Sequence, residues 1–183
     1  MTGIELLKNE HDVILKFTAH LRKMCCGILA GNEVDCDAFL ACVEFGRNYA
    51  DKHHHGKEER VLFRIMLEKM GQTAEKIIKN GMLVEHDLGR FHIMELERAI
   101  AEYRETQSIE IKLDIIANAA GYAALLKRHI EKENTVVFEF ALRTFSERDR
   151  KILDDETALF EAEAEVRENP EKYLEWLASQ PEY

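Results

Sequence analysis

Histidine and glutamate recur in this chain at a spacing that could bind metal ions. The segment His54-His55-Gly56-Lys57-Glu58 returns 75 positions later as His129-Ile130-Glu131-Lys132-Glu133. In each copy a histidine precedes a glutamate by four, and residues four apart share one face of a helix, with Cβ atoms about 6 Å apart. Each copy therefore offers an imidazole and a carboxylate to one point in space.

The same offset relates Glu10-His11-Asp12 to Glu85-His86-Asp87, and every repeated histidine is in register with the apolar positions of its segment. Burying two carboxylates in such a core is costly unless their charge is compensated, and a bound cation would compensate it. The alternative is a set of satisfied core histidines with buried Glu–His pairs and no metal. We favour a metal centre, with these candidate ligands: His11, His54, Glu58, His86, His129 and Glu133.

Two further residues could lie beside this centre. His55 precedes Glu59 by four, so a helix rotated by one position would turn these two inward instead, but their counterparts in the repeat are Ile130 and Asn134. We therefore expect His54 to bind the metal and leave open whether His55 is an additional ligand or a neighbour of one. Tyr122 lies two turns before His129 on the same face, either as a redox-active or proton-donating neighbour or as a core tyrosine.

The acidic residues next to the first and third histidines are poor ligands for the same ion, because adjacent helical residues point in different directions. Glu10 and Glu85 either face solvent or accept a ring N–H from an imidazole on a neighbouring helix. We expect His53 to be exposed, since it follows the polar side occupied by Lys57.

The apolar periodicity predicts an all-α protein, since no stretch alternates as a strand requires. Four long helices joined by short loops imply antiparallel neighbours, and hence an up-down-up-down four-helix bundle. The expected long helices run from Thr2 to about Leu29, from about Asp37 to Lys69, from Met82 to about Glu105 and from Ser108 to about Thr144. A short connecting helix is expected from Thr73 to Lys79, closed by Asn80-Gly81.

A helical extension should follow the bundle. Ser146 can cap a charged helix that reaches about Arg167, and Asn169-Pro170 is a start signal for a last short helix. We therefore expect a single domain over residues 1–183, with the bundle at about 2–144 and the C-terminal helical extension at about 146–183.

The net charge of −10 argues against a nucleic-acid partner, which requires a basic face, and against an anionic membrane surface. The chain shows no N-terminal run of the signal-peptide type and no stretch near the ~20 apolar residues of a spanning helix. We expect a cytoplasmic protein. Its 4 cysteines lack the spacing of a zinc or dithiol motif and are interpreted as reduced thiols.

Taken together, these motifs resemble the hemerythrin-like family of HHE cation-binding domains. The resemblance covers roughly residues 4 to 142 and rests on Glu10-His11, His54-His55-x-Lys57-Glu58-Glu59, Glu85-His86-x-x-Gly89-Arg90 and His129-Ile130-x-Lys132-Glu133. It implies a four-helix bundle around a non-haem di-iron site. Carried over to this sequence, the ligands are the same six residues that the repeat singles out.

The sequence departs from oxygen-carrying hemerythrins at two positions. Their third helix has a His-x-x-x-His pair, whereas here Arg90 follows His86 by four. Their last carboxylate is an aspartate five residues after its histidine, whereas Glu133 follows His129 by four. The pattern is more similar to a symmetric branch associated with sensing, with peroxide or nitric-oxide chemistry, and with iron handling.

Imidazoles and carboxylates together suit iron, with zinc or manganese as substitutes. The leading hypothesis is therefore a di-iron protein that binds, senses or reduces dioxygen, peroxide or nitric oxide at an open iron position. One alternative is a non-catalytic iron or oxygen sensor that displays its C-terminal helices to a partner. Another is a protein that stores iron or repairs damaged iron centres.

Overall fold

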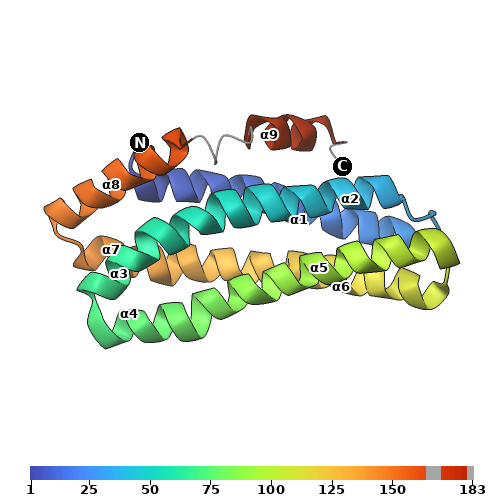
Figure 1. Ribbon diagram of the computed structural model, residues 1–183, viewed down its shortest axis with the longest axis horizontal. Helices are drawn as coiled ribbons and strands as arrows, with labels where there is room; N and C mark the ends of the chain where they lie inside the picture. Colours follow the sequence, from blue (N-terminus) through green and yellow to red (C-terminus); the bar gives the residue numbers. More distant parts are fainter. Residues whose placement is uncertain (164–169, 181–183) are drawn as a thin grey trace.

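The structure, a computed structural model, describes residues 1–163 and 170–180, which form helices with no strand among them. Four long helical rods lie side by side in an elongated bundle (Figure 1). The first rod is α1 (Gly3–Leu29), and the second joins α2 (Cys36–Phe45), η1 (Gly46–His55), η2 (Glu58–Phe63) and α3 (Arg64–Lys69). The third joins α4 (Gly71–Ile77), η3 (Ile78–Met82) and α5 (Leu83–Thr106), and the fourth joins α6 (Ile109–Lys132), η4 (Glu133–Val137) and α7 (Phe138–Thr144). The predicted all-α bundle is confirmed.

The segments labelled η are π-helical: their backbone hydrogen bonds join residues five apart instead of four, so each turn holds more residues than the 3.6 of an α-helix. They continue the rods without a break. They also lie where the candidate ligands are, since η1 ends at His55, η2 begins at Glu58 and η4 begins at Glu133. The side chains on these turns therefore point in directions that an ideal α-helix does not predict.

The rod ends follow local sequence signals. Thr2 and Glu5 form a reciprocal capping box at the start of α1, as their spacing predicts. Ser108 caps α6 through the backbone N–H of Glu110. The sharp turn before it passes through Gln107 in the left-handed region, with φ 51°.

Two predicted boundaries are wrong. Asn80-Gly81 does not close a short connecting helix, because α4 passes through η3 directly into α5, and the burial of Ile78 and Met82 holds this stretch in helical form. Packing of an apolar face outweighs the weak local propensity of Asn and Gly.

The other boundary is that of α8 (Glu147–Ala162), which ends before the expected Arg167, because Glu163 is extended, with φ −63° and ψ 134°. Arg167 itself lies outside the described residues. The last helix, α9 (Pro170–Ser179), begins at Pro170 as predicted. In Figure 1, α8 and α9 follow one another along the outside of the bundle.

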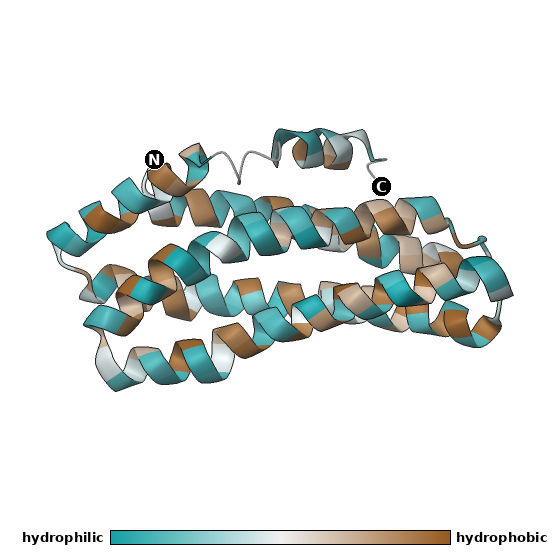
Figure 2. Ribbon diagram, viewed as in Figure 1, coloured by the Kyte–Doolittle hydropathy of each residue, from teal (hydrophilic) through white to brown (hydrophobic). Residues whose placement is uncertain are grey.

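The apolar interior has two parts. One contains Phe17, Phe45 and Leu126, and α9 packs on it through Tyr173. The other contains Leu62 and Phe138 from the bundle together with Leu153 and Phe160 from α8. The candidate ligands belong to neither part, although they are buried. Hydrophobic and hydrophilic residues alternate along the rods (Figure 2), and no described helix is long and apolar enough to cross a membrane.

Candidate metal centre

All six predicted ligand residues meet in the bundle interior, and none is more than 1% exposed. Together with His55 they form two groups, in each of which one ligand atom of every residue lies within 4.8 Å of the others. The first ligand group consists of His11, His54, Glu58 and Glu133. The second ligand group consists of His55, Glu58, His86 and His129. Glu58 belongs to both groups, so its two carboxylate oxygens could bridge two ions.

The carboxylates lie between the imidazoles of the two groups. Glu58 places Oε1 3.7 Å from Nε2 of His54 and Oε2 3.5 Å from Nε2 of His86. Glu133 Oε2 is 3.2 Å from Nε2 of both His11 and His129. Each carboxylate can therefore contact both halves of the centre, which is how carboxylates hold paired metal ions a few ångströms apart.

An acceptor outside the centre orients each imidazole through Nδ1. The Nδ1 atoms of His54 and His129 lie 2.9 Å from Glu10 and Glu85, respectively. The other partners are Asn134 for His11 at 2.9 Å, Asp51 for His55 at 3.3 Å and Glu59 for His86 at 2.7 Å. Because a carboxylate or amide oxygen only accepts, Nδ1 donates in each of these contacts, which leaves Nε2 as the ring atom available to a metal ion. Of the two alternatives for Glu10 and Glu85, the orienting role is the observed one.

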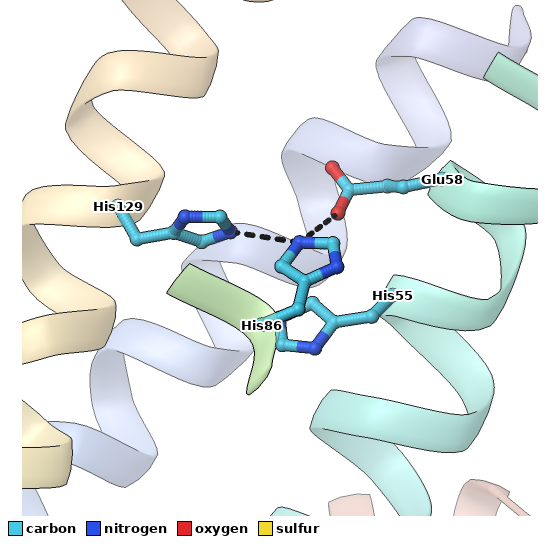
Figure 3. A group of neighbouring side chains, drawn as sticks. All are labelled: His55, Glu58, His86 and His129. Atoms are coloured by element: carbon cyan, nitrogen blue, oxygen red, sulfur yellow. Dashed lines mark hydrogen bonds and ion pairs between the residues drawn. The ribbon is translucent and has the colours of Figure 1, made fainter. Parts of the chain in front are cut away.

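The inward atoms lack protein partners and suit a cation. Figure 3 shows His86 between His129 and Glu58, with the ring of His55 stacked on it. The Nε2 atoms of His86 and His129 are 3.1 Å apart, which places two lone pairs against each other in the neutral tautomers. Four buried Oε atoms of Glu58 and Glu133, and Nε2 of His11 and His54, have no hydrogen bond. Buried polar atoms are rarely left in this state, and a metal ion in each group would bind them.

Electrostatics in the absence of a metal supports the same conclusion. Burial lowers the pKa of His129, but the Glu133 carboxylate more than reverses this and raises that pKa to about 9. Burial acts in the opposite direction on Glu133, yet His129, His11 and His86 hold its pKa well below the ordinary value. The centre thus retains positive charge around its carboxylates, either as bound protons or as metal ions.

Three residues near His54 and Glu58 are buried, although the ideal helix period turns His54 and Glu58 inward instead of them. His53 is 6% exposed and Lys57 is 1% exposed, so the prediction that they lie on a polar face is wrong. His55 is 2% exposed and belongs to the second ligand group, so it lies where an additional ligand would lie. The wide turns of η1 explain this, because more residues per turn bring consecutive histidines to the interior.

Lys57 links the centre to the C-terminal extension. Its ammonium contacts Glu10, which also contacts His54, and Glu161 on α8. It further contacts Nε2 of His53 at 3.0 Å. Burial opposes ionisation of Glu10, but hydrogen bonds from His53 and His54 and the charge of Lys57 keep its pKa low. No motif in the sequence points to Glu161, which lies 104 positions from Lys57.

Tyr122 is 2% exposed and lies beside His55 at the wall of a small cavity. Its ring packs edge-on against Phe17, so it is part of the core as well as a neighbour of the centre. Among the described residues it has no contact with a candidate ligand short enough to be a hydrogen bond.

Comparison with known protein families agrees with this geometry. The sequence model of the family described as Hemerythrin HHE cation binding domain matches residues 2–141. No curated protein matches the chain closely enough to be reported as a relative. The matched region ends before α8, so the extension that contacts Lys57 lies outside it. By its bundle, its buried histidine and glutamate residues and this match, the chain belongs to the hemerythrin family of HHE cation-binding domains.

Proposed function

We propose that this protein holds two iron ions, one in each ligand group, and that it binds, senses or reduces a small oxygen or nitrogen species there. The observation that carries the proposal is the pair of buried groups sharing Glu58, in which both carboxylates and Nε2 of His11 and His54 have no hydrogen-bond partner. Imidazole and carboxylate suit iron, manganese and zinc. The resemblance to hemerythrin-like proteins, which implies a non-haem di-iron site, supports iron among these.

The two groups have different donors. The first ligand group has two imidazoles and two carboxylates, and the second has three imidazoles and the Glu58 carboxylate. Glu133 also lies near the second group, with Oε1 3.9 Å from Nε2 of His86. Six-coordinate iron would retain positions for an exogenous ligand in either group. Iron bound here would supply a redox-active centre that exchanges such a ligand. The protein's own residues orient the imidazoles, share the carboxylates and exclude bulk water.

Metal analysis combined with anaerobic spectroscopy tests the proposal. Protein purified under iron-replete conditions should contain two ions per chain, and its absorption spectrum should change on separate additions of dioxygen, peroxide or nitric oxide. The ligand that produces a fast and reproducible change identifies the chemistry. Metal analysis giving one ion or none would contradict the two-ion centre, and an unchanged spectrum with all three ligands would contradict an open position.

Metal binding should also stabilise the fold, since without it five imidazoles and two carboxylates share a desolvated space. Metal-free protein should melt at a lower temperature than the loaded protein. Equal melting temperatures, with metal content verified, would argue against a centre at these residues.

A sensor function without turnover is a second candidate, supported by the path from His54 through Glu10 and Lys57 to Glu161 on α8. If metal loading changes the position of His54, the contact between Lys57 and α8 should change with it. Hydrogen–deuterium exchange of the α8 backbone in loaded and metal-free protein measures this. Equal exchange would leave the ligand-binding function in place and remove the support for a sensor.

Iron storage or repair, the other alternative, instead predicts that the loaded protein loses its iron rapidly to a chelator.

A further inference from the structure

A small cavity lies between η1 and α5 and borders the second ligand group only. Its volume is about 130 Å³, and its walls include Gly46, Gly89, Ile93, Tyr122, His55 and Arg90. A cavity needs about 10–15 Å³ by this measure to hold one water. The space therefore accepts a molecule of a few heavy atoms beside the second ligand group.

Two glycines leave this space open. A Cβ atom at Gly46 would lie 2.6 Å from Cδ1 of Ile93 and 3.3 Å from the hydroxyl of Tyr122, and one at Gly89 would lie 3.4 Å from the Tyr122 ring. Neither glycine has a positive φ, so backbone conformation does not require them. A glycine inside a helix costs about 1 kcal/mol relative to alanine. At Gly46 a side chain would clash with Ile93, whereas at Gly89 a methyl group would only touch the Tyr122 ring, so a larger side chain is needed there to fill the space.

Tyr122 lines this cavity and offers it a hydroxyl group. The residue is 2% exposed, and no hydrogen bond joins its hydroxyl to any residue that the structure describes. A buried tyrosine usually finds a hydrogen-bond partner. Burial raises the pKa of Tyr122, so the group is a neutral donor at physiological pH. A ligand in the cavity would be its acceptor.

The outer wall is an ion-pair network that leads to the same ligand group. Arg90 lies 2.8 Å from Asp51 and 2.7 Å from Glu59. Asp51 in turn holds His55, and Glu59 holds His86. The cavity is therefore lined by Arg90 and by His55, and the ring of His86 is stacked on that of His55.

We propose that this cavity admits and holds the small ligand that reacts at the second ligand group, with the Tyr122 hydroxyl as its hydrogen-bond donor. The ligand class is an acceptor of two or three heavy atoms, such as dioxygen, peroxide or nitric oxide. This inference rests on the proposed function and adds to it the side from which the ligand approaches and the residue that positions it. Tyr122 is a positioning residue here, and Gly46 and Gly89 set the size limit.

Azide, a linear anion of three atoms, is the probe for the test. Its affinity and association rate are measured by absorption on iron-loaded wild-type protein and on Tyr122→Phe, Gly89→Ala and Gly89→Leu, with metal content determined for each. Gly81→Ala is the matched control, because Gly81 lies in a helical rod and a Cβ there meets nothing within 4 Å.

Tyr122→Phe should weaken azide binding about tenfold, the value of one hydrogen bond, with an almost unchanged association rate. Gly89→Leu should slow association at least about tenfold, with Gly89→Ala between it and the wild type, and Gly81→Ala should change neither quantity. A crystal of the loaded protein soaked in azide should place the anion against the Tyr122 hydroxyl.

Two kinds of failure are distinguishable. If wild-type protein holds no metal, the proposed function fails, and this inference fails with it. If all variants hold two ions but bind azide with wild-type affinity and rate, the proposed function stands and the cavity inference is overturned. Azide located elsewhere at the metal ions, with none in the cavity, also overturns it.

Discussion

The two halves of the bundle carry the same glutamate–lysine pair in opposite environments. Glu10 orients His54 and contacts Lys57, and 75 positions later Glu85 orients His129 and contacts Lys132. The Lys57 side chain is 1% exposed, whereas that of Lys132 is 51% exposed. Helix α8 accounts for the difference, because Glu161 and Phe160 cover Lys57.

The repeat thus sets what the halves share, and the segments outside it set how they differ. The shared features are the imidazoles, the carboxylates between them and the acceptors that orient the rings. The differences are the α8 contact in the first half and, in the second ligand group, His55, whose counterpart is the apolar Ile130. A symmetric sequence pattern therefore produces an asymmetric centre, with one ligand group joined to the extension and the other joined to a cavity.

The largest effect should come from the residue common to both groups. Glu58→Ala should lose both metal ions, because its carboxylate is the ligand shared by the two groups. Glu59→Ala should retain two ions at saturating metal, with affinity about 10–100-fold lower because Glu59 orients His86. Metal content after gel filtration measures both, and the exposed Glu131→Ala is the control. Two ions in Glu58→Ala would refute the shared-carboxylate geometry.

The paired lysines test the contribution of α8 to stability. Lys57→Met should lower the free energy of unfolding by on the order of 3 kcal/mol, because Glu10 loses its cation while it stays buried. Lys132→Met should cost about 0–1 kcal/mol, since that pair is exposed. Urea denaturation of the metal-free proteins measures the difference. If both substitutions lower the free energy of unfolding equally, the contact of α8 with Lys57 does not contribute to stability.

Replacing His55 with the residue of the other half tests the asymmetry of the centre. His55→Ile should lower the binding affinity of one metal ion about 10–100-fold and leave that of the other unchanged, because His55 belongs to the second ligand group only. Calorimetric titration of metal-free protein separates the two binding events. In the internal repeat the counterpart of His55 is Ile130, which cannot bind a metal ion, so the repeat predicts that a His55 variant keeps both ions. Unchanged affinities would show that His55 is a neighbour of the ligands and not a ligand itself.

The smallest effect concerns pH. In metal-free protein the pKa of His129 is raised from 6.5 to about 9, so its stabilising contribution is complete below pH 6.5 and is lost as the pH rises through 9. The urea midpoint of the metal-free protein should therefore fall between pH 6.5 and 9, and His129→Gln should show a shallower fall. If the urea midpoint falls equally steeply with pH in both proteins, the assignment to His129 is contradicted.

The helical class, most rod boundaries and the six residues that meet in the centre were predictable from the sequence. These follow from local information: capping residues, the 3.6-residue period and an offset that repeats a His-x-x-x-Glu spacing. The orienting role of Glu10 and Glu85 was one of two alternatives that the sequence allowed, and the packing of neighbouring rods selected it.

Packing between the rods sets three features that the sequence did not predict: the burial of His53 and Lys57, the place of His55 in a ligand group and the cavity beside Tyr122. The ideal helix period fails at η1, because its wider turns depend on packing and leave no mark in the sequence. Burial of Lys57 requires Glu161, which lies 104 positions away and joins it only after α8 folds back onto the bundle. Contacts of this kind depend on the path of the whole chain, which the spacing of residues within one helix does not encode.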